Sequence, residues 1–215
     1  MIKFENTEVM NFEGAIRGMR NPLNSWDKSD SEYSLDWNTK PDTGIMFNIG
    51  DNDLALMKKL IRAGSDHRKF MRQILVSVDI TAPLYWWKEF DTYKVGTVSN
   101  SCSTMHKIHA KEITLEDFST ERLNERGIQV LEFIIENLEA YRKMYKIMKN
   151  KEDWYNIIQL LPSSYNQKRT ITLNYETLRN IYRSRCNHKL DEWSIGFMEW
   201  IESLPYANEL IIDRS

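Results

Sequence analysis

The chain has 215 residues, a formal net charge of −2 at pH 7 and 41% hydrophobic residues, which suits one well-buried core and excludes a strongly basic nucleic-acid-binding protein. No apolar run is long enough to cross a bilayer, and the first six residues lack the apolar region of a signal peptide. Two cysteines, Cys102 and Cys186, exclude a disulfide framework, so we expect a cytoplasmic protein with no membrane or nucleic-acid partner.

The N-terminal half is predicted to contain short elements around one long loop. Their order is a strand over 8–11, a helix over 12–19, a loop over 21–44 that includes Trp37, a helix over 51–63, a strand over 74–80 and a helix over 84–90. The helix over 51–63 has the clearest signals: Asp51 or Asp53 is the expected cap, and Gly64 follows its end.

The C-terminal half is predicted to be mainly helical. Its elements are a long helix that ends near Met148, a helix over 154–161, a strand over 169–174 and helices over 175–185 and 190–203. We expect Ser119 or Thr120 to cap the long helix. The pattern predicts an α+β fold, with a small mixed or antiparallel sheet packed against a long-helix bundle. Without a linker or repeat, residues 1–215 are expected to form a single domain.

Several signatures of common enzymes are absent: a dinucleotide-binding glycine motif, a phosphate-binding loop, His-Glu-x-x-His and Gly-x-Ser-x-Gly. A zinc site is one alternative. On a helix, Cys102, His106 and His109 would share a face, and Cys186 and His188 could complete a tetrahedral site. This spacing matches no known finger, and a free cysteine usually packs as a small hydrophobe, so we predict no metal.

The segment 92–106 is the most chemically suggestive part of the chain. Its Ser and Thr hydroxyls, with Gly96 and Asn100, lie between Lys94 and His106 and offer many donors to an anion or a heterocycle. From the residues alone, a polar loop that leads into a helix is the favoured interpretation. The 7 Trp, 10 Tyr and 8 Phe also fit a structural or interaction protein.

The same segment resembles a degenerate form of the signature of the flavin-dependent thymidylate synthases, also called thymidylate synthase complementing proteins. That signature is Arg-His-Arg-x-x-Ser-x-Asn-Glu-x-Ser-x-Arg-Tyr, preceded by Glu-His and followed by Leu-Pro and an Asn-x-Arg-Ser-Leu region. The matching positions, from about residue 50 to 200, are Asp66-His67, Thr92-Tyr93-Lys94, Thr97, Asn100, Ser103, Leu161-Pro162, Asn174, Asn180 and Arg185.

The resemblance implies a homotetramer with its active sites between subunits. Such an enzyme uses FAD, methylene-tetrahydrofolate and NADPH to methylate dUMP at C5, and the hydride comes from reduced flavin. Carried over by position, the residues expected to contact FAD are His67, Tyr93, Asn174 and Asn180. Those expected to contact the nucleotide are Glu89, Lys94, Asn100, Ser103 and Arg185. The resemblance assigns no catalytic residue.

The chain also departs from this signature. Thr92-Tyr93-Lys94 replaces Arg-His-Arg, Met105-His106 replaces Arg-Tyr, and Glu176 replaces a C-terminal arginine with a carboxylate that would repel an anion. Losing two or three charge-assisted hydrogen bonds is expected to weaken the binding of a nucleotide by about several hundredfold. Two hypotheses follow: a divergent synthase acting on a dUMP-like nucleotide, or a catalytically inactive protein that binds a nucleotide or signalling molecule on the same scaffold.

Overall fold

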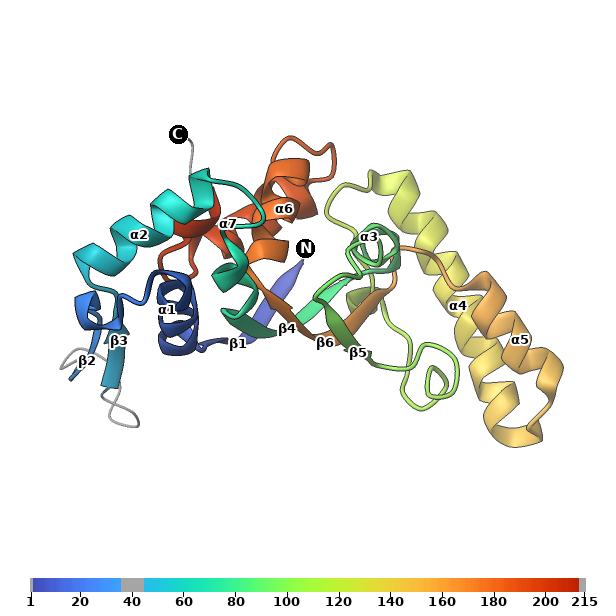
Figure 1. Ribbon diagram of the computed structural model, residues 1–215. Helices are drawn as coiled ribbons and strands as arrows, with labels where there is room; N and C mark the ends of the chain where they lie inside the picture. The colour runs from blue at the N-terminus through green and yellow to red at the C-terminus, as the bar shows by residue number, and fades with distance from the viewer. Residues whose placement is uncertain (1, 36–44, 213–215) are drawn as a thin grey trace. The chain divides into compact units, whose positions relative to one another are not determined.

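The computed structural model describes residues 2–35 and 45–212 and has an α+β fold (Figure 1). Trp37, which belongs to the loop predicted over 21–44, lies outside the described ranges. The N-terminal elements are β1 (Lys3–Met10), α1 (Phe12–Arg20), η1 (Asn21–Leu23), η2 (Trp26–Lys28), β2 (Glu32–Leu35), β3 (Ile45–Asn48), α2 (Asp51–Arg62), η3 (Lys69–Arg72), β4 (Leu75–Pro83) and α3 (Leu84–Phe90). The C-terminal elements are β5 (Val98–Ser101), η4 (Leu115–Asp117), α4 (Glu125–Met148), α5 (Lys151–Leu160), β6 (Asn166–Asn174), α6 (Tyr175–Arg185), η5 (Glu192–Phe197), α7 (Met198–Glu202) and η6 (Asn208–Ile212).

The strands form two small sheets, as expected for this fold class. One sheet has the order β1-β4-β6-β5, and the other is the antiparallel pair β2-β3, in which Tyr33 lies opposite Phe47. The chain divides into two compact units: residues 1–5, 79–93 and 99–171 form unit 1, and residues 6–78, 94–98 and 172–215 form unit 2. Strands β1, β4 and β6 each have residues in both units. That residues 1–215 form a single domain stays a prediction.

Unit 1 is built on the helical hairpin of α4 and α5, which are adjacent elements in contact. Its core contains buried apolar side chains from the loop before α4, from both helices and from the start of β6. These are Ile108, Ile113, Phe118, Leu131, Ile135, Leu138, Ile157 and Tyr165. Apolar residues at helical spacing on α4 therefore make one face of this core, as the sequence predicts.

The cap of the long helix differs from the prediction. Asn124 caps α4, and its Oδ1 accepts a hydrogen bond of 2.9 Å from the Gly127 N–H. Ser119 is used elsewhere, because its hydroxyl lies 2.8 Å from Asn166 Oδ1 at the start of β6. The residues before Asn124 instead contain the short 3₁₀ turn η4, so the helix begins later than expected.

Unit 2 contains the part of the predicted loop over 21–44 that the structure describes, and an ion pair and hydrogen bonds hold this part in place. The Arg20 guanidinium contacts Asp53 Oδ1 at 2.6 Å and donates to the carbonyls of Ser25 and Lys28, both at 3.0 Å. Asp53 is therefore a buried ion-pair partner rather than the predicted cap. Asp30 caps α2 instead, since its carboxylate accepts from the backbone N–H of Asn52 and of Asp53.

The other helices of unit 2 largely follow the sequence pattern. Gly64 has a φ of 107° just past the end of α2, a backbone conformation that favours glycine. The helix predicted over 190–203 is less regular: the π-helical η5 precedes the short α7. Across residues 2–35 and 45–212, the structure contains no helix with the length and apolarity that membrane crossing requires.

Candidate functional site

The segment 92–106 is irregular apart from strand β5. The Ser103 hydroxyl accepts hydrogen bonds from the Met105 and His106 N–H groups, at 3.3 and 2.9 Å, which closes a local turn. Because residues 102–110 form turns and bends, the helical face proposed for Cys102, His106 and His109 does not exist. In the part of the chain that the structure describes, no three His, Cys, Asp or Glu side chains gather as metal ligands.

Within unit 2, the junction of β6 and α6 contacts Val95 and Gly96 of this segment. Asn174 caps α6, and its Oδ1 accepts from the Thr177 N–H at 2.9 Å. Its Nδ2 faces the Gly96 carbonyl at 3.5 Å, and the Thr177 hydroxyl lies 3.2 Å from the Val95 carbonyl. A Cβ at Gly96, where φ is 72°, would lie only 2.5 Å from Asn174 Nδ2. Position 96 therefore requires glycine in this arrangement.

The carboxylate of Glu176 is paired with the guanidinium of Arg68. The Arg68 Nε lies 3.0 and 2.9 Å from the two carboxylate oxygens of Glu176, and both side chains are largely buried. The substitution of glutamate for the arginine of the signature is thus matched by a cation from the segment after α2. This pairing removes the repulsion of an anion that the sequence predicts at Glu176.

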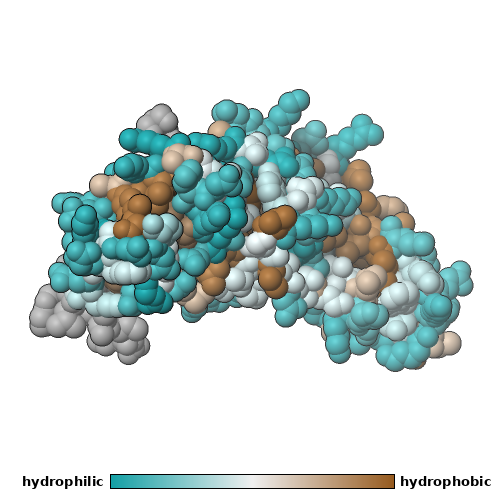
Figure 2. Space-filling model, in the orientation of Figure 1, coloured by the Kyte–Doolittle hydropathy of each residue, from teal (hydrophilic) through white to brown (hydrophobic). Residues whose placement is uncertain are grey.

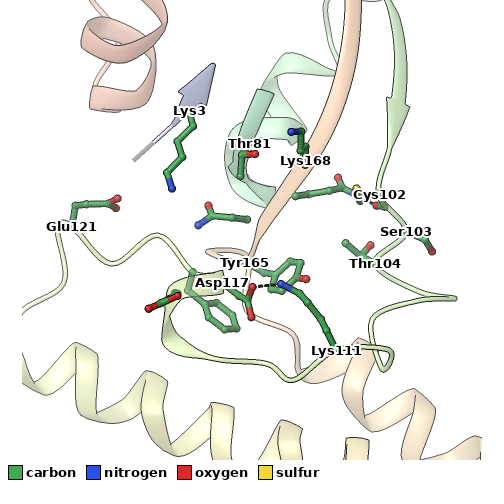
Figure 3. A pocket seen from close by; sticks show the side chains of 14 residues that line it. Lys3, Thr81, Cys102, Ser103, Thr104, Lys111, Asp117, Glu121, Tyr165 and Lys168 are labelled. Carbon is green, nitrogen blue, oxygen red and sulfur yellow. Dashed lines mark hydrogen bonds and ion pairs between the residues drawn. The ribbon is translucent and has the colours of Figure 1, made fainter. Parts of the chain in front are cut away.

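Unit 1 contains a cavity of about 350 Å³, a volume in the range of small-molecule sites. Ser103 is the one predicted site residue on its wall, and the lysine ammonium of Lys3 points into it from β1 (Figure 3). The full lining is Lys3, Thr81, Cys102, Ser103, Thr104, Lys111, Glu116, Asp117, Phe118, Glu121, Tyr165, Asn166, Gln167 and Lys168.

Ion pairs set the charges in this cavity. Contact with Asp117 raises the pKa of Lys111 above its ordinary value, and hydrogen bonds to Glu5 and Asp79 raise the pKa of Lys168. Burial raises the pKa of the Tyr165 phenol. At neutral pH both lysines are therefore cationic and the phenol keeps its proton. A wall of this kind, with hydroxyls and amides beside charge pairs, suits a small polar ligand with hydrogen-bonding groups.

These lysines could not be predicted from the sequence. Lys3, Lys111 and Lys168 lie in three distant parts of the chain, and none belongs to a motif. Unit 2 has a second cavity, of about 310 Å³, which contains no predicted site residue. Its lining is Glu13, Ile16, Arg17, Arg20, Trp26, Ser29, Ser31 and Phe47.

Comparison with known proteins identifies the architecture. No protein-family model matches the sequence, and no curated protein is significantly similar to it. A crystal structure of thymidylate synthase X from Helicobacter pylori with FAD and dUMP matches 99% of this chain and 98% of its own, with a TM-score of 0.67 and 16% identity. A second structure of the flavin-dependent enzyme from the same organism, also with FAD and dUMP, matches 98% of each chain, with a TM-score of 0.66 and 18% identity.

The fold is that of the flavin-dependent thymidylate synthases. At this identity the likeness establishes the fold, as the degenerate signature predicts.

The positions expected to contact FAD on this thymidylate synthase fold differ in their surroundings. His67 is exposed in the turn after α2, and Asn180 is exposed on α6. Tyr93 is half-buried after α3, in unit 1, whereas the other three lie in unit 2. The buried Asn174 already uses its amide to cap α6 and to face Gly96. Neither of the two cavities described above is lined by these residues.

The positions expected to contact the nucleotide are also distributed over both units. Glu89, Asn100 and Ser103 lie in unit 1, where Asn100 is exposed on β5 and Glu89 is half-buried on α3. In unit 2, Lys94 is exposed, and the guanidinium of Arg185 lies 5.2 Å from the centre of the Trp193 ring. Of these five residues, Ser103 is the one that lines a described cavity.

Proposed function

We propose that this chain is a divergent flavin-dependent thymidylate synthase-like protein that methylates C5 of a dUMP-like pyrimidine nucleotide. The observation that carries the proposal is the match of nearly the whole chain to solved enzymes that hold FAD and dUMP. In the proposed reaction methylene-tetrahydrofolate supplies the carbon, NADPH reduces the flavin, and the reduced FAD supplies the hydride.

Residues of this chain would bind and orient the nucleotide. Ser103 lies in a wall that also has three lysines and three carboxylates, and this supports a small polar ligand with hydrogen-bonding groups close to the signature segment. Arg185 would add a forked donor for a phosphate or a pyrimidine carbonyl. His67, Tyr93, Asn174 and Asn180 are proposed to face FAD. These four residues line neither of the two described cavities, and we propose a homotetramer in which a second subunit completes each site.

A catalytically inactive binding protein on the same scaffold is the second candidate. It is favoured by the replacement of Arg-His-Arg by Thr92-Tyr93-Lys94. It is also favoured by the hydrogen bonds that the Asn174 side chain makes within its own chain. Such a protein would bind a nucleotide or a signalling molecule without turnover. It would keep the polar cavity of unit 1 and need no flavin.

The first experiment is purification without added cofactor, followed by a visible spectrum and mass spectrometry of the released small molecules. The proposed function predicts flavin absorption, either as purified or after addition of excess FAD. Methylation of dUMP should then depend on methylene-tetrahydrofolate and NADPH. Absence of flavin after addition of excess FAD would contradict the synthase, and a different nucleotide in the released fraction would favour the binding protein.

Arg185 provides a matched test of the nucleotide site. Arg185→Ala is expected to weaken dUMP binding about ten- to hundredfold, the loss of one charge-assisted contact, while flavin binding changes little. Isothermal titration of dUMP into the purified protein measures the effect. Arg183→Ala, an exposed arginine on the same helix, is the control and should leave the affinity unchanged. Equal affinities for the Arg185→Ala variant and the parent would reject the assignment.

A further inference from the structure

The cavity of about 310 Å³ in unit 2 plays no part in the proposed function. Its wall combines one face of α1 with the turn η2 and the strand β3, which supply Ile16, Trp26 and Phe47 respectively. Figure 2 shows a mainly hydrophilic face of the molecule, on which hydrophobic residues form separate patches rather than one broad surface for a protein partner. A cavity of this size points to a small molecule as its occupant.

Three polar side chains in the wall already have partners within the chain. The guanidinium of Arg20 contacts Asp53 and two backbone carbonyls. The hydroxyls of Ser29 and Ser31 donate to Asp53 Oδ2, at 2.7 and 2.6 Å. A ligand that needs many hydrogen bonds, such as a sugar, would have to break these bonds to use the same groups. The three side chains therefore fix the shape of the cavity and leave recognition to others.

Two aromatic rings give the cavity much of its apolar surface. Trp26 is 50% exposed, and its Nε1 donates to Asn21 Oδ1 at 2.8 Å, which restrains the indole. The half-buried Phe47 ring stacks on Phe12, with 6.4 Å between the ring centres, and meets the Tyr33 ring edge-on at 4.9 Å. Rings restrained in this way can pack against a flat ring at little further cost in side-chain freedom.

Glu13 and Arg17 supply the charges on the α1 side of the wall. They lie four residues apart on the helix, and both are exposed. Within residues 2–35 and 45–212, no ion pair joins them, and Arg17 has no other carboxylate partner. One carboxylate oxygen of Glu13 accepts a hydrogen bond from the Tyr33 hydroxyl at 3.1 Å. In the described part of the chain, the second oxygen of Glu13 and the guanidinium of Arg17 are thus available to a ligand.

We propose that this cavity binds an aromatic α-amino acid. The ring packs against Trp26 and Phe47, the carboxylate binds the guanidinium of Arg17, and the ammonium binds the carboxylate of Glu13. Side chains four apart on a helix are neighbours on one face, so one amino-acid headgroup can reach both charges. A simple aromatic acid would place its carboxylate near Glu13, and a simple aromatic amine would meet Arg17. The two opposite charges therefore favour a zwitterion over either.

The test is isothermal titration with three probes: L-phenylalanine, L-phenylalaninamide, which lacks the carboxylate, and 3-phenylpropionate, which lacks the ammonium. The parent protein should bind L-phenylalanine about tenfold more tightly than either analogue, because each analogue loses one charge-assisted contact. Absence of saturable binding of L-phenylalanine, or equal affinities for the three probes, would overturn the proposal.

Two variants assign each headgroup contact to its residue. Arg17→Ala should abolish the preference for L-phenylalanine over its amide and keep the preference over 3-phenylpropionate. Glu13→Gln should do the reverse, and it retains an acceptor for the Tyr33 hydroxyl. Trp26→Ala should weaken all three probes alike, because it removes only ring packing. Preferences that stay as in the parent in both charge variants would contradict the site.

Matched controls separate this cavity from other effects. Arg62→Ala removes an exposed arginine at the end of α2 and should leave all three affinities unchanged. Circular dichroism checks that each variant keeps its helices. Saturating FAD and dUMP should not displace L-phenylalanine, and competition by either would overturn the proposal. Flavin and nucleotide binding are measured independently, so a failure here is distinguishable from a failure of the proposed function.

Discussion

Replacing Asp53 with alanine is expected to destabilise the protein by about 3–5 kcal/mol, because the Arg20 guanidinium would remain buried without its carboxylate. The Asp53 side chain is fully buried and that of Arg20 is 4% exposed. The hydroxyls of Ser29 and Ser31 also donate to Asp53 Oδ2, at 2.7 and 2.6 Å. The loss of all these bonds should be measured as the free energy of unfolding in urea.

The control for this change is Asp51→Ala. Asp51 lies in the same first turn of α2 but is exposed, so its removal should cost much less than that of Asp53. Similar losses for the two variants would contradict the role of the buried pair.

The Asp53 carboxyl is also expected to make the free energy of unfolding depend on pH. Burial opposes ionisation of Asp53, but hydrogen bonds from Ser31 and Ser29 and the Arg20 charge together lower its pKa below the ordinary value of 3.8. The stability from Asp53 is therefore fully present above pH 3.8 and is lost as the pH falls through the lower pKa of the folded state. Asp53→Asn should flatten this acid limb in parallel urea titrations.

Trp87→Ala is expected to cost about 3–5 kcal/mol, the range for removing a large aromatic side chain from a core. Trp87 is 1% exposed, and its Nε1 donates to the Gln167 carbonyl at 2.9 Å. The guanidinium of Arg169 lies 4.1 Å from its ring centre, and the rings of Trp86 and Phe90 pack edge-on against it. The variant loses this packing and leaves a carbonyl at the start of β6 without its donor.

Trp26 provides the comparison for Trp87, because it is 50% exposed on η2. Trp26→Ala should lower the free energy of unfolding by much less in the same urea experiment. Trp87→Phe, which keeps most of the ring but not the N–H, should fall between the two. Equal effects of Trp26→Ala and Trp87→Ala would show that Trp87 does not support the core of unit 1.

Local periodicity predicted much of the fold. The helices expected over 51–63, 84–90 and 175–185 agree with α2, α3 and α6, because apolar spacing and nearby turn residues define such elements within a short window. The caps of α2 and α4 differ from the predicted ones for different reasons. Asp30 reaches α2 from about twenty residues away in sequence, and Asn124 follows other polar residues that could each cap α4.

The candidate site was less predictable, because its contacts join distant residues. Arg68 neutralises Glu176 from 108 positions away, and the lysines of the cavity in unit 1 come from three separate segments. No periodic pattern reports such pairs. Ser103 lines the cavity of unit 1, and the ligand contacts that the resemblance assigns to all nine residues stay predictions.

The close approach of Gly96 to Asn174 also constrains how this protein can vary among its relatives. Any larger residue at position 96 would displace the amide that caps α6, and φ at that position already disfavours other side chains. A tolerated replacement at one position therefore needs a smaller or reoriented residue at the other. The two sites are expected to co-evolve, although 78 positions separate them in sequence.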